Sequence, residues 1–152
     1  MKSAGHASAL WLSLLCLAGP AVAGKAGDTV SPQRARSLYL LHCAGCHQID
    51  GSGTPAFGIP SMIDSLGAFL RTSAGRAFLV QVPGARNANV SDAELAALTN
   101  WELRAFSAAT LPADFRPYTT TEVTHWRANP PVDIAAARAA VVAGLPVAAT
   151  AK

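Results

Sequence analysis

The feature that most constrains this chain is the run Cys43-Ala-Gly-Cys46-His47. Two cysteines with two residues between them, followed directly by a histidine, form the C-x-x-C-H sequence at which c-type haem is attached. In that chemistry the thiols of Cys43 and Cys46 add across the porphyrin vinyl groups, and His47 binds the iron as its proximal ligand. A haem domain this short cannot build a large core alone. We therefore expect the covalently held porphyrin to supply apolar surface to the core and to stabilise the fold as a cross-link.

Three other chemistries share the C-x-x-C pattern. A thioredoxin-like redox pair needs a βαβ setting, which the sequence does not suggest. A structural zinc site needs a second ligand pair at short spacing, and no second C-x-x-C or H-x₃-H follows. A disulfide between Cys43 and Cys46 would leave His47 without a role. Haem attachment uses all three residues, so we expect one haem c as the cofactor.

The N-terminal segment has the pattern of a secretory signal peptide. A short basic start that includes Lys2 is followed by an apolar run over residues 9–18 and then by Ala-Val-Ala ending at Ala23. We expect cleavage after Ala23 and a periplasmic mature chain without a membrane span. The leucines before Cys16 disfavour a lipoprotein, and a retained N-terminal anchor stays open as an alternative.

Cysteine usage and charge limit the partners. Cys16 should leave with the signal, so the mature chain keeps only Cys43 and Cys46, which must be reduced by an assembly system when haem is attached. The formal net charge is +3, with the arginines scattered along the chain. No basic run or aromatic-basic interleaving is present, so we expect no nucleic-acid partner. The arginines form either a solvated surface or a weak electrostatic ring that steers an acidic partner.

The chain downstream of the signal is expected to be helical. Ser31 and Pro32 are a good helix start, and Ser91 with Glu94 forms a capping box. Between the first two helices, a loop rich in glycine and proline over residues 51–60 allows tight turns against a flat ring. Such signals and the apolar spacing predict helices over about 31–42, 91–106, 119–127 and 133–143. Residues 64–70 and 73–82 are expected to form one or two further helices, which Pro83-Gly84 ends.

Residues 31–107 resemble a class I c-type cytochrome domain. The resemblance rests on a first helix that ends in CAGCH, on the loop HQIDGSGTPAFGIPSM, and on the closing helix VSDAELAALTNWEL. It implies an all-α, cytochrome c-like domain in which the first and last helices cross at right angles. The implied contact pairs Leu38 or Tyr39 with Leu98 or Trp101.

The resemblance also implies how the proximal histidine is oriented. Pro60 matches the proline of the family's haem loop. The Nδ1–H of His47 is then expected to donate to a backbone carbonyl near Pro60, which would make the ligand more basic.

The resemblance breaks at the sixth iron ligand. The family usually has a methionine shortly before the last helix, and residues 82–90 contain none. Met62 is the one methionine of the mature chain, and it is either a core residue beside the haem or the distal thioether ligand. His125 lies beyond the last family helix, and His42 is too near Cys43 to reach the other face of the ring. A haem without a protein sixth ligand also stays open.

Beyond residue 107 the resemblance ends. The remaining helices form an arm that either packs on the haem domain or docks a partner, and the tail from Leu145 is expected to be disordered. The expected organisation is a signal peptide over 1–23, a linker over 24–30, a haem domain over 31–107, and a helical arm and tail over 108–152.

The resemblance implies a periplasmic monohaem cytochrome that carries single electrons and has no catalytic residues of its own. The implied partners are a periplasmic dehydrogenase as donor and an oxidase or another cytochrome as acceptor. Because fold does not fix function, two alternatives stay open. The missing family methionine favours an open-coordination haem protein, such as a gas sensor or a peroxidase-like enzyme. The extra tail favours the cytochrome subunit of a larger oxidoreductase.

Overall fold

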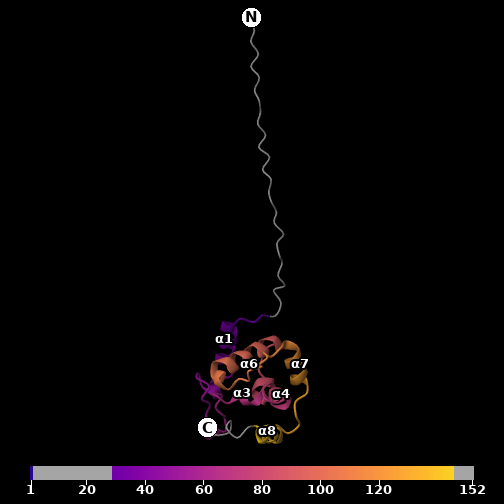
Figure 1. The fold of residues 1–152 in the computed structure, drawn as a ribbon. Helices are drawn as coiled ribbons and strands as arrows, with labels where there is room; N and C mark the ends of the chain where they lie inside the picture. The colour runs from indigo at the N-terminus through magenta and orange to yellow at the C-terminus, as the bar shows by residue number, and fades with distance from the viewer. Residues whose placement is uncertain (2–28, 146–152) are drawn as a thin grey trace.

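The structure is a computed structural model that describes residue 1 and residues 29–145. The expected signal peptide, its cleavage site, most of the linker and the end of the tail lie outside these residues. Within them all regular structure is helical, so the all-α prediction is confirmed for the described chain (Figure 1). Of the described helices, none has both the length and the apolar character needed to cross a membrane.

The described residues form eight α-helices and two 3₁₀ helices. Their bounds are α1 Pro32–His42, α2 Ala44–His47, η1 Pro55–Phe57, α3 Leu66–Phe69, α4 Ser73–Gln81, α5 Pro83–Arg86, α6 Asp92–Phe106, η2 Ala108–Thr110, α7 Thr120–Ala128 and α8 Ile134–Ala143. The two 3₁₀ turns η1 and η2 join longer elements, and an isolated antiparallel bridge links Thr54 to Ile59.

Side-chain caps fix the helix starts where the sequence places them. The Ser31 hydroxyl accepts the Arg34 amide at 3.1 Å at the start of α1. Ser91 and Glu94 form the expected reciprocal capping box on α6. Each cap satisfies amides that have no partner inside the helix, so these boundaries are set locally and the predictions for α1 and α6 are confirmed.

Two local predictions differ from the structure. The helix expected over residues 64–70 is only the four-residue α3, and Asp64 has a φ of +52°, outside the right-handed helical region. The stop that Pro83-Gly84 predicts is observed, since α4 ends at Gln81, but Pro83 also begins the short helix α5. Proline suits the first position of a helix because its missing amide has no intrahelical partner there.

The first long helix packs on the last helix of the expected haem domain. Leu38, Tyr39 and Leu98 are buried at this contact, and the rings of Tyr39 and Trp101 lie 5.3 Å apart between centroids. Phe106 adds a second ring at 5.0 Å from Tyr39. The predicted pairing of α1 with α6 is confirmed.

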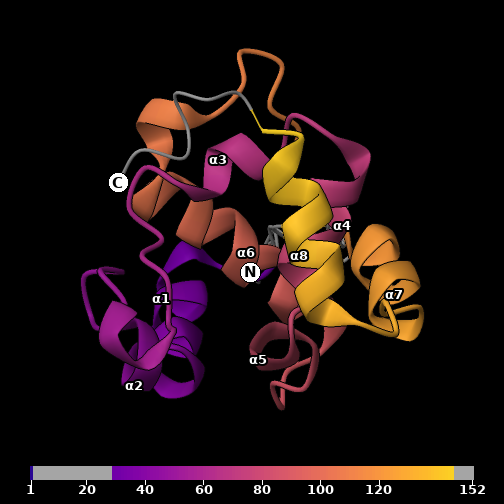
Figure 2. The ribbon, with the colours of Figure 1, turned by 90° about the horizontal axis from the view of Figure 1, so that it is seen from below.

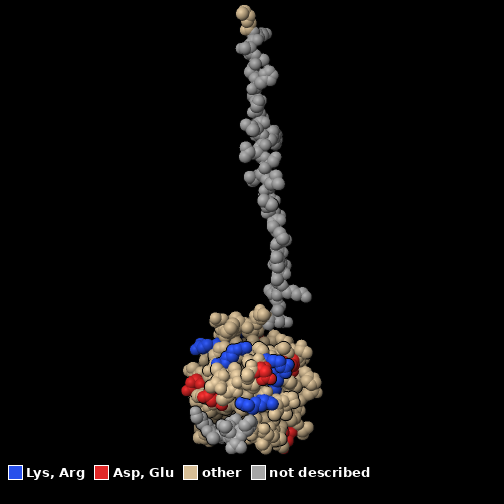
Figure 3. Space-filling model, in the orientation of Figure 1, with Lys and Arg blue, Asp and Glu red and all other residues tan. Residues whose placement is uncertain are grey.

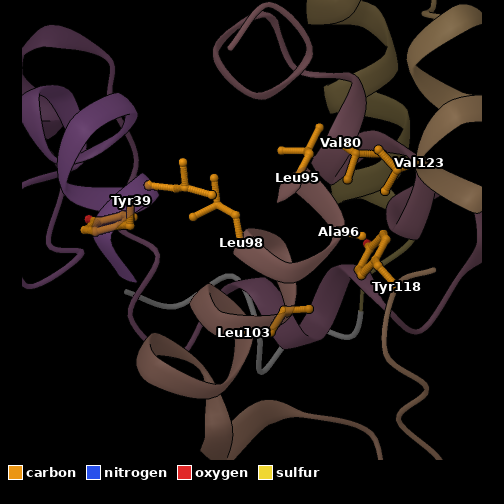
Figure 4. Packing of buried hydrophobic residues seen from close by; sticks show 9 residues of the cluster. Tyr39, Val80, Leu95, Ala96, Leu98, Leu103, Tyr118 and Val123 are labelled. Atoms are coloured by element: carbon orange, nitrogen blue, oxygen red, sulfur yellow. The ribbon is translucent and has the colours of Figure 1, made fainter. Parts of the chain in front are cut away.

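The core continues past residue 107. Figure 4 shows the main cluster of buried apolar residues, which come from α1, α4, α6, α7 and the segment before α7. Its members are Leu38, Tyr39, Val80, Leu95, Ala96, Leu98, Leu103, Tyr118 and Val123. Tyr118 and Val123 belong to the arm, defined from here on as residues 108–145. For this part of the arm the packing role is observed, and docking of a partner stays a prediction.

Two arginines, Arg76 and Arg127, have a structural role. They bond to groups within the fold and do not belong to a solvated surface or to a ring of charges that steers a partner. Arg76 is buried, and its guanidinium pairs with Glu122 and donates to the carbonyls of Arg116 and Pro117 at 2.8 and 3.0 Å. The planar guanidinium matches a carboxylate and fixed carbonyls at once. It therefore attaches the arm to α4, and Arg127 plays a similar part on α7.

Candidate functional site

The motif forms one helical turn at the end of α1. The Tyr39 carbonyl accepts the Cys43 amide at 2.9 Å, and the Cys43 carbonyl accepts the amides of Cys46 and His47 at 3.1 and 2.9 Å. Residues three and four apart on a helical turn share a face. The turn therefore brings the three predicted site residues, Cys43, Cys46 and His47, together.

Both cysteines of the turn are free. Cys43 is partly buried and Cys46 is exposed. The described chain contains no strand beyond the isolated bridge, so residues 29–145 do not provide the setting of a thioredoxin-like pair. Over the same residues, no three His, Cys, Asp or Glu side chains converge as a metal site.

Burial sets the state of His47. The ring is partly buried, which lowers its pKa, and the backbone of Pro60 opposes this as a weaker effect. Burial disfavours the charged imidazolium, so the ring is neutral and has a free lone pair at neutral pH. The buried Nδ1 atom nevertheless makes no hydrogen bond of normal geometry. The His47 ring therefore lies near the Pro60 backbone, but the expected hydrogen bond from Nδ1 to a carbonyl there is not formed.

The loop after the motif folds back under it. The His47 carbonyl accepts the Gly53 amide at 2.9 Å, and the Thr54 hydroxyl donates to the Cys46 carbonyl at 3.2 Å. Gly53 has a φ of +70°, and a Cβ there would lie 2.5 Å from the Pro60 carbonyl oxygen. Only glycine allows the backbone at position 53 to come this close to Pro60. The close contact places Pro60 beside the motif.

Tyr39 connects the motif to the α1–α6 contact. Its hydroxyl donates to the carbonyl of Gln48, the residue after His47. Its ring packs against both Trp101 and Phe106, which also contact each other. The histidine turn is thus held from the aromatic contact as well as from its own loop.

Met62 is anchored by its backbone close to the same loop. Its amide donates to the Gly51 carbonyl at 2.8 Å, and its carbonyl accepts the buried Ser107 hydroxyl at 2.6 Å. Ser107 Oγ also accepts the Leu66 amide at 3.0 Å. The Met62 side chain is partly buried against the core cluster. The hydrogen bonds of its amide and carbonyl fix the Met62 backbone beside the loop, so a move of the whole residue to another side of the site would break them.

Residues 82–90, where the resemblance calls for a methionine, form α5 and the turn that follows it. Ala85 and Val90 pack against the core cluster. Figure 2 shows α2 and α5 apart from each other, both below α6 in that view. His42 and His125, the other histidines of the described chain, are exposed.

Glu102 is a site residue that sequence reasoning missed. It lies on α6 beside the Cys43 thiol, and burial raises the pKa of its carboxyl to about 7. Burial, followed by the Glu102 charge, raises the pKa of Cys43 to about 12. Burial also raises the pKa of Tyr39 to about 12. The position one turn after Leu98 on the buried face of α6 was the available signal for Glu102.

We expect stability to depend on Glu102 between pH 4.5 and 7. A carboxyl whose pKa is raised in the folded state binds its proton there while the unfolded chain has released it, so stability falls as pH rises through this window. The expected loss is roughly 2–3 kcal/mol, measured by denaturant unfolding at several pH values. Glu102→Gln should remove the fall. Glu94→Gln is the control, because the Arg34 bond lowers the pKa of Glu94, and it should keep the fall. An unchanged profile in Glu102→Gln would contradict the assignment.

Comparisons with known proteins add no family to this description. No protein-family model matches the chain, and no curated protein matches it in sequence. The part of the chain that the structure describes is all-helical, and it presents the thiols of Cys43 and Cys46 and the imidazole of His47 from one turn.

Proposed function

We propose that this chain is an exported monohaem c-type cytochrome that transfers single electrons. The observation that carries the proposal is the turn at the end of α1. Cys43 and Cys46 are free, and both lie on the same turn as the partly buried His47. This is the set of groups that covalent haem attachment requires.

The side chains of Cys43, Cys46 and His47 fit a covalently attached haem. Cys43 and Cys46 would hold it covalently, and the neutral imidazole of His47 would bind the iron. Haem c, when bound, supplies an iron centre that alternates between the ferrous and ferric states. The buried Nδ1 of His47 has no partner in the structure, and a small turn of the ring toward the nearby Pro60 backbone would satisfy it.

Exposed apolar side chains near the motif support electron transfer to a protein partner. Beyond residue 1, six large apolar side chains are exposed in the described chain, and five of them lie between residues 40 and 63: Leu40, Leu41, Ile49, Phe57 and Ile63. No Lys or Arg occurs between Arg36 and Arg71. On the face shown in Figure 3, basic and acidic side chains are interspersed. These features favour an apolar partner contact near the motif over steering by a basic ring.

The test is to express the full chain with a haem-assembly system and to extract the purified protein with acidified organic solvent. The colour should stay with the protein, and a redox titration should show one electron per chain. Free extraction of the haem would contradict the proposal, as would a colourless protein from the same host.

A second candidate, a haem protein with an open iron site, is favoured by the anchoring of Met62. The bonds to Gly51 and Ser107 support a packing role for Met62, and residues 82–90 offer no thioether. In that case the ferric protein lacks a sulfur–iron charge-transfer band, and the ferrous protein binds carbon monoxide. Met62→Ala would then cost roughly 2–5 kcal/mol of stability and leave the spectrum unchanged. If Met62 is the distal ligand, the band is present, and Met62→Ala removes it and lowers the potential.

A further inference from the structure

Gln48, the residue directly after His47, has a strained backbone. It ends α2 as the C-cap, with a φ of +65° and a ψ of 165°. This region of backbone conformation is occupied almost only by glycine, because a Cβ there crowds the backbone. The Gln48 side chain is exposed, so its burial does not offset the strain. The conformation must therefore be imposed by contacts of the backbone.

The strained peptide determines where the chain goes after the motif. The His47 amide donates to the Cys43 carbonyl at 2.9 Å, which ties it to α2. The His47 carbonyl accepts the amide of Gly53, from the returning loop, at 2.9 Å. Gln48 lies between these two attachments. A relaxed, negative φ at Gln48 would turn the chain in another direction and separate Gly53 from His47.

A buried hydroxyl holds this peptide in place. Tyr39 is fully buried, and its hydroxyl donates to the Gln48 carbonyl. A second bond to the same carbonyl, from the Gly51 amide, is long at 3.4 Å. The Tyr39 ring lies against Trp101 and Phe106, with centroids 5.3 and 5.0 Å away. The hydroxyl is therefore fixed by the contact between α1 and α6.

We propose that Tyr39 is a positioning residue, whose hydroxyl holds Gln48 in its strained conformation and thereby fixes the direction in which His47 presents its imidazole to iron. The proposal deepens the proposed function and rests on it for the iron. Packing against α6 requires only the aromatic ring, which phenylalanine would supply equally well. The role therefore belongs to the hydroxyl, and it can be separated from packing by experiment.

The experiment uses the full-length holoprotein. Tyr39→Phe keeps the ring and removes the hydroxyl. Gln48→Gly removes the strain, because glycine adopts a positive φ at little cost, whereas Gln48→Ala keeps the Cβ and the strain. Both changes at position 48 are made alone and together with Tyr39→Phe. Tyr118→Phe is the matched control, because Tyr118 is also buried and its hydroxyl donates to a backbone carbonyl, that of Arg76, at 2.6 Å.

Two quantities are measured. The first is hydrogen exchange of the Gly53 amide, which reports the bond between His47 and the returning loop. The second is the electron paramagnetic resonance spectrum of the ferric protein, because its line widths report the spread of imidazole orientations at the iron. A loss of stability that leaves the histidine turn intact would change neither quantity.

Tyr39→Phe should raise the exchange rate of the Gly53 amide at least tenfold and broaden the ferric signal at least twofold. Adding Gln48→Gly should restore both quantities, whereas adding Gln48→Ala should restore neither. Tyr118→Phe should match the wild type. Unchanged exchange in Tyr39→Phe would overturn the proposal, and so would faster exchange with an unchanged ferric signal, or equal rescue by Gln48→Ala.

The single variants at position 48 carry the test if Tyr39→Phe does not fold. Gln48→Gly should then unfold at a higher denaturant concentration than Gln48→Ala, and equal midpoints would overturn the proposal. A wild type without covalent haem would overturn the proposed function and the role of Tyr39 toward iron. Exchange of the Gly53 amide, which needs no haem, would still test the hold of Tyr39 on Gln48.

Discussion

Replacing His47 by alanine is expected to reduce the yield of holoprotein at least tenfold. His47 is the imidazole that shares a turn with both thiols, and its low pKa keeps the lone pair free for iron. Its loss would remove the proposed bond to iron and also the imidazole that lies beside the loop around Gly53 and Pro60. The measurement is the haem absorbance per unit of purified protein, together with the ferric and ferrous spectra.

His42→Ala and His125→Ala are the matched controls. Both histidines are exposed, one at the end of α1 and the other on α7. Their loss removes an imidazole without touching the turn, so yield and spectrum should match the wild type. A normal yield from His47→Ala, with an unchanged spectrum, would refute the assignment of the proximal ligand.

Replacing Arg76 by methionine is expected to lower the free energy of unfolding by about 3–5 kcal/mol, the usual cost of removing one partner of a buried ion pair. The Arg76 side chain is only 9% exposed, and Glu122 is 28% exposed. Methionine keeps most of the volume but leaves Glu122 and the carbonyls of Arg116 and Pro117 without their donor. Loss of the cation above the Tyr118 ring, now 4.1 Å from its centroid, adds to the effect.

Denaturant unfolding measures this change, and Arg34→Met is the control. Arg34 also forms an ion pair, with Glu94 at 2.7 Å, but its side chain is 53% exposed. Exposed pairs contribute about 0–1 kcal/mol, so Arg34→Met should stay within that range. If both variants lost the same small amount, Arg76 would be an ordinary surface arginine and the attachment of the arm would need another explanation.

The helices were predictable because their signals are local. Ser31, and Ser91 with Glu94, satisfy amides within three residues of themselves, and Pro32 suits the first position of a helix, so the sequence alone indicates where α1 and α6 begin. The chemistry of the motif is equally local, since its three residues share one turn. The pairing of Tyr39 with Trp101 followed from the resemblance, which supplied the long-range information that capping rules lack.

The parts that escaped prediction depend on long-range partners. Arg76 and Arg127 looked like scattered surface charges because most of their acceptors are backbone carbonyls, which every residue carries and no motif marks. Ser107 follows α6 as its C-cap, and nothing in the sequence marks its hydrogen bond to the Met62 carbonyl, which lies 45 positions away. Glu102 has an ordinary helical position, and its pKa is raised only by burial in the folded chain.

The hydrogen bonds from Arg127 to the carbonyls of Arg86, Ala88 and Val90 have a consequence for how this protein can change over time. A carbonyl is the same whatever side chain its residue bears, so the hold does not specify which side chains stand at Asn87 and Asn89, both of which are exposed. Substitutions there can accumulate without loosening residues 86–90. A thioether or an imidazole introduced at such a position would arrive on a backbone already fixed from the arm. The side chains at these positions can therefore change while the backbone of residues 86–90 stays in place.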